Sequence, residues 1–242
     1  MKKLLSICIP TYEMRGLGTE FLKNSFDILF KQTFKDFEII ISDHSKNNSI
    51  ENLCNEYKNK LDIKYFRNTE KFGNLSFNIN NAIKKAEGKL IKILFQDDFL
   101  YHEKSLEEIV NNFDLEKDNW LITSCIHSID GQNFFKPFYP KYNKLIFLGK
   151  NTISSPSVLT IKNKRPLFFD ENIIWLMDCD YYKRCYNEFG NPKILNKINV
   201  VNRIGKHQTT NYIVNKKIKL KELFYIIKKY AYNRIIQRTR IG

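Results

Sequence analysis

Apolar and polar residues follow two different periods along the first hundred positions. Short, nearly continuous apolar runs are typical of buried strands, and they occupy residues 4–10, 37–42, 63–67 and 90–95. Between them, apolar residues recur at helical spacing, as at Leu22, Phe26 and Leu29. Strands and helices that alternate with short connections predict an α/β fold, a mostly parallel sheet flanked by helices.

The pattern is less regular after residue 100. Helical spacing predicts helices over 106–113 and 178–189, and strands are expected over 120–127 and 194–204. Residues 131–150 are rich in aromatic residues but have no clear period. We find no internal repeat and no flexible linker. Near the end, one apolar helical face predicts a C-terminal basic amphipathic helix from Leu220, Leu223, Phe224, Ile227, Tyr230 and Ala231.

Charge is concentrated at the C-terminal end of the chain. The 242 residues carry 40 Lys and Arg against 26 Asp and Glu, a net charge of +14. Residues 216–242 hold nine of the basic residues and one acid, a net +8. A basic amphipathic helix can lie on an anionic membrane surface, and it can equally pack on the body with its lysines solvated. Both alternatives stay open from the sequence.

Cysteine use and the N-terminal segment bear on where the protein works. The five cysteines form an odd set without C-x-x-C spacing, which favours a reducing compartment over a disulfide framework or zinc ribbon. The first ten residues have the pattern of a strand rather than a signal peptide, and no apolar window is long enough to span a bilayer. We therefore expect a cytoplasmic protein, with the inner face of the plasma membrane as a peripheral location.

Acidic and amide side chains follow several of the predicted strands. Ligands bind open α/β sheets at the carboxyl ends of strands, which directs attention to 10–13, Asp43, Asn68 and 96–98. Asp97 and Asp98 are adjacent acids that need compensation, and Mg²⁺ bound to phosphate oxygens supplies it. The alternative is that both acids only cap the following turn.

The order and spacing of these segments resemble the family 2 inverting glycosyltransferases, which have the GT-A fold. The matching segments are Ser6–Tyr12, Glu38–Asp43, Asn78–Ile83 and Ala86–Lys92, leading into Phe95–Asp98. The resemblance implies a nucleotide-sugar-binding half over 1–100, an acceptor-binding half over 101–215, and a helical tail over 216–242. It also implies Mg²⁺ or Mn²⁺ as cofactor and a nucleotide sugar, with UDP the expected nucleotide, as substrate.

The resemblance also assigns roles to individual residues. Asp98 corresponds to the family's metal ligand, and His207 to a further candidate ligand in a loop that closes over the diphosphate. Gln96 stands where many members have Asp, so it adds no charge. The nucleotide-binding residues implied are Pro10, Thr11, Tyr12, Glu13, Asp43, Asn68, Asn78, Gln96, Asp97 and Lys206.

A second acidic segment, Asp178-Cys179-Asp180, resembles the family's general-base motif at the start of the acceptor-side helix. By that pattern Asp178 is the base, and Asp180 remains a rival because Met177 replaces the usual Glu. Without the resemblance, both acids would simply favour a helix N-terminus.

The predicted activity is therefore inverting hexosyl transfer to a hydroxyl of a glycan or lipid-linked acceptor. This activity implies a role in polysaccharide biosynthesis at the cell envelope, as a peripheral membrane enzyme. The alternatives are a metal-dependent nucleotidyltransferase and a basic nucleic-acid-binding module. Neither has its sequence signature here, such as a Gly-rich basic loop after the first strand or a zinc-finger spacing, so no nucleic-acid partner is expected.

Overall fold

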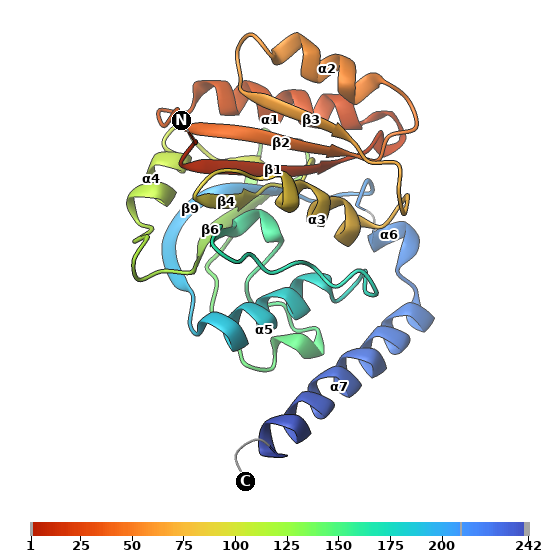
Figure 1. Cartoon of the computed structure of the whole chain (residues 1–242). Coiled ribbons are helices and arrows are strands. Elements are labelled where there is room, and N and C mark those ends of the chain that lie inside the picture. The colour runs from red at the N-terminus through yellow and green to blue at the C-terminus, as the bar shows by residue number, and fades with distance from the viewer. Residues whose placement is uncertain (1, 209, 240–242) are drawn as a thin grey trace.

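One twisted sheet organises the molecule. The computed structural model describes residues 2–208 and 210–239. Within these residues, nine strands form a single sheet with the order β3-β2-β1-β4-β8-β6-β9-β5, and β7 pairs with β6 outside this path. Helices cover the sheet, and the longest of them, α7, extends to the C-terminal end (Figure 1).

The first half of the sheet is parallel, as the alternating pattern predicts. It contains β1 (Leu5–Thr11), β2 (Phe37–Asp43), β3 (Ile63–Arg67) and β4 (Leu90–Ile93). All residues of β1, β2 and β4 are buried, which explains their continuous apolar runs. The connecting helices are α1 (Gly18–Lys31), α2 (Ser49–Tyr57) and α3 (Leu75–Lys85), with α1 and α2 on one side of the strands and α3 on the other (Figure 1).

The second half of the sheet is mixed. Strand β8 (Leu159–Lys162) runs antiparallel between β4 and β6 (Trp120–Ser128), while β9 (Lys193–Arg203) runs parallel to β6. Two further antiparallel strands are β5 (Phe99–Leu100) beside β9 and β7 (Phe134–Phe138) beside β6. The mostly parallel arrangement thus belongs to the first four strands. The hydrophobic pattern did not reveal β5, β7 or β8 because they are short and β7 is largely solvent-exposed.

The remaining elements complete the chain between and after these strands. They are η1 (Met14–Gly16), α4 (Ser105–Asn111), η2 (Ile146–Leu148), η3 (Pro156–Val158), α5 (Met177–Phe189), α6 (Thr210–Ile213) and α7 (Lys216–Thr239).

A large hydrophobic core joins residues from both halves of the sheet, and a small second cluster consists of Phe99, Ile126 and Val201. The segments 1–100 and 101–215 therefore share one sheet and one core. All five cysteines are buried and none forms a disulfide. One cation lies inside this core: Lys92 on β4 is fully buried, and its ammonium donates hydrogen bonds to the carbonyls of Ser157 and Leu159. Burial lowers the pKa of Lys92 to about 7, against the opposing attraction of Asp98.

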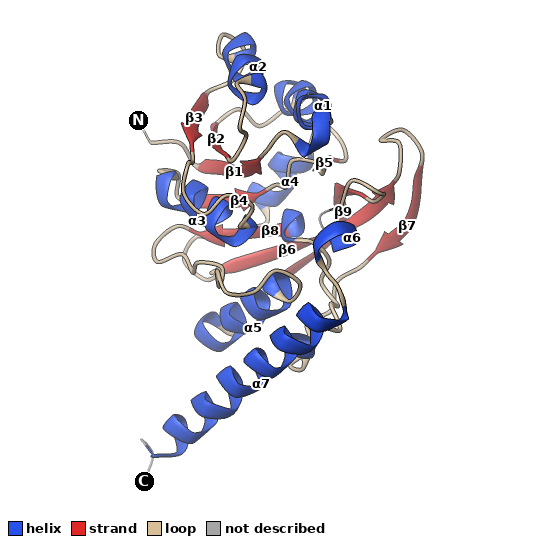
Figure 2. Cartoon of the chain, turned by 90° about the vertical axis from the view of Figure 1, so that its right-hand side faces the viewer, coloured by secondary structure: helices blue, strands red, loops and turns tan. Residues whose placement is uncertain are grey.

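The C-terminal helix packs on the body through a narrow face. Among the side chains that the structure describes in α7, those of Glu222, Ile226 and Tyr230 are buried, and they are spaced at i, i+4 and i+8. Leu220, Phe224 and Ile227 of the predicted apolar face are exposed by 59%, 66% and 44%. Of the predicted apolar face only Tyr230 is buried, so this face lies largely open, and polar contacts of Glu222 and Tyr230 join the helix to the body. Figure 2 shows α5 and α7 side by side.

No helix in the described part of the chain is both long and apolar enough to cross a bilayer.

Candidate active site

A cleft of about 520 Å³ lies where β1, β2 and β4 end. Its walls come from the segments that follow these strands, from the end of β9 and from the first turn of α5. Parallel strands bring their carboxyl ends to one edge, so residues distant in sequence meet there. Among the lining residues are Pro10, Tyr12, Glu13, Met14, Arg15, His44, Lys46, Asn78, Gln96, Asp97, Asp98, Ser155, Asp178, Asn202 and Arg203.

Gln96 fixes the loop that follows β1. Its Oε1 accepts a hydrogen bond from the Tyr12 N–H at 3.0 Å, and its Nε2 donates to the Gly18 carbonyl at 2.8 Å. A Cβ atom at Gly18 would lie 2.4 Å from the Tyr12 carbonyl oxygen, so only glycine fits this close approach. Both polar ends of the Gln96 side chain are thus engaged with backbone, and its role here is to shape the cleft wall.

Three residues predicted to contact the nucleotide lie behind the cleft. Asp43 is fully buried and accepts hydrogen bonds from Thr11 Oγ1, Ser45 Oγ and Tyr65 Oη, at 3.1, 2.6 and 2.7 Å. Thr11 is fully buried as well, and Asn68 is buried. None of these three residues lines the cleft. They hold the strand ends that carry the lining residues, and their contact with the nucleotide stays a prediction.

Asn78 connects this buried layer to the cleft. Its Oδ1 accepts hydrogen bonds from Ser42 Oγ at 2.7 Å and Asn68 Nδ2 at 3.2 Å, and its Nδ2 donates to the Thr11 carbonyl at 3.1 Å. Unlike Asn68, Asn78 lies on the cleft wall.

Asp98 is 4% exposed and is held by protein donors on both oxygens. Its Oδ2 accepts from Ser155 Oγ and Asn202 Nδ2, each at 2.9 Å, and its Oδ1 accepts from the Arg203 N–H at 2.9 Å. Burial and the neighbouring Asp97 carboxylate raise the pKa of Asp98, and these hydrogen bonds oppose the shift. Asp98 therefore joins the end of β4 to the end of β9.

The acidic pair fits a divalent cation only as part of a complex with phosphate. Within the described residues, no group of three or more His, Cys, Asp or Glu side chains is placed to hold a metal. Asp98 Oδ1 accepts a single hydrogen bond in the structure and a carboxylate oxygen has two lone pairs, so one remains. Mg²⁺ takes one or two carboxylates plus substrate phosphates, which matches the donors that Asp97 and Asp98 supply.

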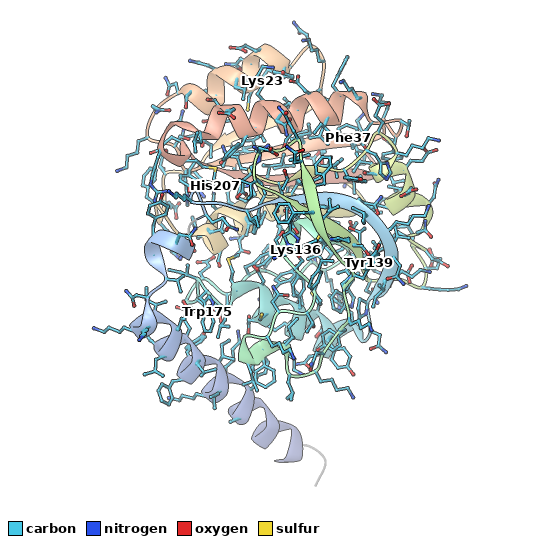
Figure 3. The ribbon with its side chains drawn as sticks, turned by 180° about the vertical axis from the view of Figure 1, so that it is seen from behind. Lys23, Phe37, Lys136, Tyr139, Trp175 and His207 are labelled. Atoms are coloured by element: carbon cyan, nitrogen blue, oxygen red, sulfur yellow. The ribbon has the colours of Figure 1, made fainter. Side chains whose placement is uncertain are left out.

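His207 and Lys206, neighbours in sequence, lie in different surroundings. His207 Nε2 is 3.2 Å from Asp97 Oδ2, and its ring meets Phe21 edge-on at 4.9 Å. In Figure 3, which views the molecule from behind, His207 lies on the side of α1. Lys206 is exposed and lines a separate hollow of about 810 Å³ together with Ile204. His207 is thus beside the acidic pair, while Lys206 does not line the cleft.

Asp178 and Asp180 lie two residues apart on α5 in opposite environments. Asp178 is half-buried on the cleft wall, and no described residue donates a hydrogen bond to its carboxylate. Burial and the nearby Asp98 raise the pKa of Asp178 to about 7. Asp180 is fully buried, pairs with Arg184 Nε and Lys229 Nζ at 2.8 Å each, and accepts from Tyr230 Oη at 2.8 Å. The rival base is therefore a structural anchor that does not reach the cleft.

Four basic residues on the cleft wall lie outside the predicted site, namely Arg15, His44, Lys46 and Arg203. His44 follows Asp43 directly, and its buried Nε2 has no hydrogen-bond partner within the described residues. Burial lowers the pKa of His44, so the neutral ring is favoured. The Arg203 guanidinium stacks 4.5 Å from the centroid of Phe21 and forms no ion pair with a described carboxylate. Their positions at strand ends were the only sequence signal for them.

Comparison with known proteins identifies the family. The profile of glycosyl transferase family 2 matches residues 6–161, so the chain belongs to this family. An uncharacterized glycosyltransferase of Methanocaldococcus jannaschii, MJ1057, is 30% identical over 87% of this chain and 78% of its own length. The protein is therefore a glycosyltransferase that transfers a sugar. This confirms the resemblance drawn from the motifs and decides against the nucleotidyltransferase and nucleic-acid-binding alternatives.

Solved structures show the same fold. TarS of Staphylococcus aureus, residues 1–349 in complex with UDP-GlcNAc, matches 94% of this chain and 66% of its own, with a TM-score of 0.71 at 19% identity. A mannosyltransferase from Pyrobaculum calidifontis, in complex with GDP-Man and Mn²⁺, matches 85% of this chain and 58% of its own, with a TM-score of 0.59 at 14% identity. The GT-A fold expected from the sequence is thus confirmed.

Proposed function

We propose that the protein is an inverting glycosyltransferase that moves a sugar from a UDP-sugar to a hydroxyl group of a glycan or lipid-linked acceptor. The observation that carries the proposal is Asp178. Its carboxylate lies on the cleft wall with no hydrogen-bond donor among the described residues, and its pKa is raised to about 7. A carboxyl group with these properties is suited to remove a proton near neutral pH.

In this proposal Asp178 removes the proton of the acceptor hydroxyl as the hydroxyl oxygen attacks the anomeric carbon. The bond between that carbon and the β-phosphate oxygen breaks on the opposite face, so the configuration inverts and UDP leaves. The product is the new glycoside, with the proton on Asp178. Positioned acid–base groups of this kind contribute about 10²- to 10⁴-fold to a rate.

The leaving diphosphate needs positive charge and hydrogen-bond donors. Arg203 lines the cleft as a cation without a carboxylate partner among the described residues, and it is the group we assign to the phosphates. Asp97 and Asp98 would hold Mg²⁺ or Mn²⁺, which would act as a Lewis acid on the diphosphate when bound. His207 Nε2, 3.2 Å from Asp97, is the further candidate ligand.

The choice of UDP and of the acceptor class rests on the relatives. TarS, which is 22% identical over 86% of this chain and 37% of its own length, carries the name poly(ribitol-phosphate) β-N-acetylglucosaminyltransferase. Its structures hold UDP and UDP-GlcNAc. A cell-envelope polymer or a lipid-linked glycan is the acceptor type that this similarity supports.

A thermal-shift screen of nucleotide sugars tests the proposal. UDP-sugars should raise the unfolding temperature, with a larger shift when Mn²⁺ is present, because a ligand that binds only the native state stabilises it. Stabilisation by GDP-sugars alone would overturn the assignment of UDP. The absence of any shift with every nucleotide sugar would contradict the donor site itself.

We further propose that the outer face of α7 contacts an anionic membrane surface. Its exposed apolar residues Leu220, Phe224 and Ile227 lie at i, i+4 and i+7, and exposed lysines flank them. Apolar side chains beside lysines on one helix suit the interface of a bilayer that carries negative charge.

Vesicle co-sedimentation of the full chain tests this membrane contact. Vesicles containing anionic phospholipid should bind the wild type, and the Leu220→Ser/Phe224→Ser double variant should bind several-fold less. Since both side chains are exposed, the fold should not change. Equal binding of the two proteins would contradict the proposal.

A further inference from the structure

Helix α5, which carries Asp178, begins without a capping side chain of its own. The residue at the N-cap position is Leu176, which makes no side-chain hydrogen bond to the first turn. Helices usually begin with Ser, Thr, Asp or Asn, because the first N–H groups have no partner inside the helix. The start of this helix therefore depends on acceptors from elsewhere in the chain.

Glu222 of α7 holds the segment that leads into α5, because it accepts the N–H groups of the N-cap residue Leu176 and of the two residues before it. Its Oε1 accepts the N–H of Ile174 at 2.8 Å, and its Oε2 accepts the N–H groups of Trp175 and Leu176 at 2.9 Å each. The residue is only 4% exposed. Figure 3 shows Trp175 beside the first turns of α7. A buried carboxylate with three backbone donors at a helix N-terminus has both the hydrogen bonds and the charge that such an end favours.

This cap lies next to the proposed base. Asp178 is the second residue of α5 and follows Leu176 by two positions. No described residue donates a hydrogen bond to the Asp178 carboxylate, so its position depends on the backbone of the first turn and on the packing around it. Glu222 holds that turn on its N-terminal side.

We propose that Glu222 is a positioning residue for Asp178, which makes α7 part of the catalytic machinery rather than an appended tail. This inference rests on the proposed function of Asp178 as the base. A displacement of about 1 Å in a reacting group can lower a rate about 100-fold, so loss of the cap should be visible in catalysis.

The chain offers a matched control on the same helix. Tyr230 lies two turns after Glu222 and donates to Asp180 Oδ1 at 2.8 Å. Tyr230→Phe loosens the packing of α7 on α5 but leaves the three N–H groups before Met177 capped. This variant therefore tests the attachment of α7 to the body without changing the contacts that position the first turn of α5.

The experiment measures hydrolysis of UDP-GlcNAc, with water in the place of the acceptor, by the full chain in the presence of Mn²⁺. Glu222→Ala should lower kcat about 10- to 100-fold while KM for UDP-GlcNAc stays within about twofold. Glu222→Gln keeps one acceptor oxygen and should recover part of the rate. Tyr230→Phe should stay within about twofold of the wild type. Comparable losses of kcat in Glu222→Ala and Tyr230→Phe would overturn the proposal.

A double-mutant cycle separates positioning from general stability. If Glu222 acts through Asp178, adding Glu222→Ala to Asp178→Asn should change the residual rate by less than about twofold. A multiplicative loss in the double variant would overturn the proposal, as would an unchanged kcat in Glu222→Ala alone. If Glu222→Ala does not fold, Glu222→Gln replaces it in the cycle.

Hydrogen exchange provides a readout that does not depend on activity. The amides of Ile174, Trp175 and Leu176 should exchange faster in Glu222→Gln than in Tyr230→Phe, and equal exchange would overturn the cap. The proposed function fails separately, if Asp178→Asn hydrolyses UDP-GlcNAc at the wild-type rate.

Discussion

Two walls of the cleft hold their carboxylates in different ways, namely the ends of β2 and β4, which we propose as the donor side, and the first turn of α5, which we propose as the acceptor side. On the donor side, Asp43 and Asp98 are buried and each accepts at least three hydrogen bonds from the protein. On the acceptor side, Asp178 faces the cleft without a described donor. A carboxylate held by many donors is suited to fix geometry, whereas one without donors is free to take a proton.

The same contrast recurs within α5. Asp180 has two cationic partners and a tyrosine hydroxyl, and it anchors α7 to the body. Asp178 lies two residues earlier and has neither a cationic partner nor a hydroxyl donor among the described residues. Environment therefore separates two acids that the sequence leaves as rivals, and the predictions below test this separation.

The largest effect is expected from Asp178→Asn. The amide has nearly the same shape but cannot accept the proton, so kcat for sugar transfer or for hydrolysis of UDP-GlcNAc should fall about 10²- to 10⁴-fold. The Kd for UDP, measured by calorimetry, should change little. A kcat within a few-fold of the wild type would remove Asp178 from the role of base.

Asp180→Asn should instead lower stability. The substitution leaves Arg184 and Lys229 beside an amide in a buried site, and breaking a buried ion pair costs about 3–5 kcal/mol. Urea unfolding at neutral pH measures this loss, with Asp178→Asn as the matched control. If both variants were equally destabilised, the contrast between the two acids would be wrong.

Asp98→Asn should weaken nucleotide binding when the divalent cation is present. Loss of one charged ligand should reduce the affinity for UDP about tenfold in Mn²⁺, which is about 1.4 kcal/mol, and less in EDTA. Calorimetry in the two buffers measures the difference, and Asp114→Asn on the exposed surface serves as control. An unchanged affinity in Mn²⁺ would contradict a role for Asp98 in holding the metal.

An effect of similar size concerns stability and pH. The folded protein raises the pKa of Asp178 from 3.8 to about 7, so the folded state binds this proton more tightly than the unfolded state does. The wild type should therefore lose stability relative to Asp178→Asn as the pH rises from about 4 through 7. With allowance for the partial exposure of Asp178, the variant should be about 1–2 kcal/mol more stable at pH 8. Equal unfolding free energies of the wild type and Asp178→Asn at pH 8 would mean that burial does not raise the pKa of Asp178.

Much of the donor side could be predicted from sequence because its signals are local. Buried parallel strands show as apolar runs, and the residues after each run mark the cleft. Even so, the sequence did not distinguish Asn78, which lines the cleft, from Asn68 and Asp43, which lie behind it. That distinction depends on side-chain hydrogen bonds across neighbouring strands.

The acceptor side depends on contacts between distant segments. Strand β8 lies at the centre of the sheet, yet its four residues are too short to give a period. The cap of α5 comes from Glu222, 46 residues beyond Leu176, so no local motif reveals it. The same helix buries Ile226 and leaves Phe224 exposed, and the sequence alone did not indicate which of its residues pack on the body.

The crystal structure of the protein with UDP and Mn²⁺ tests the central claim most directly. The account predicts UDP in the cleft, with the diphosphate between Asp98 and Arg203 and its β-phosphate end toward Asp178. UDP bound instead in the separate hollow beside Lys206, or against the lysines of α7, would contradict it.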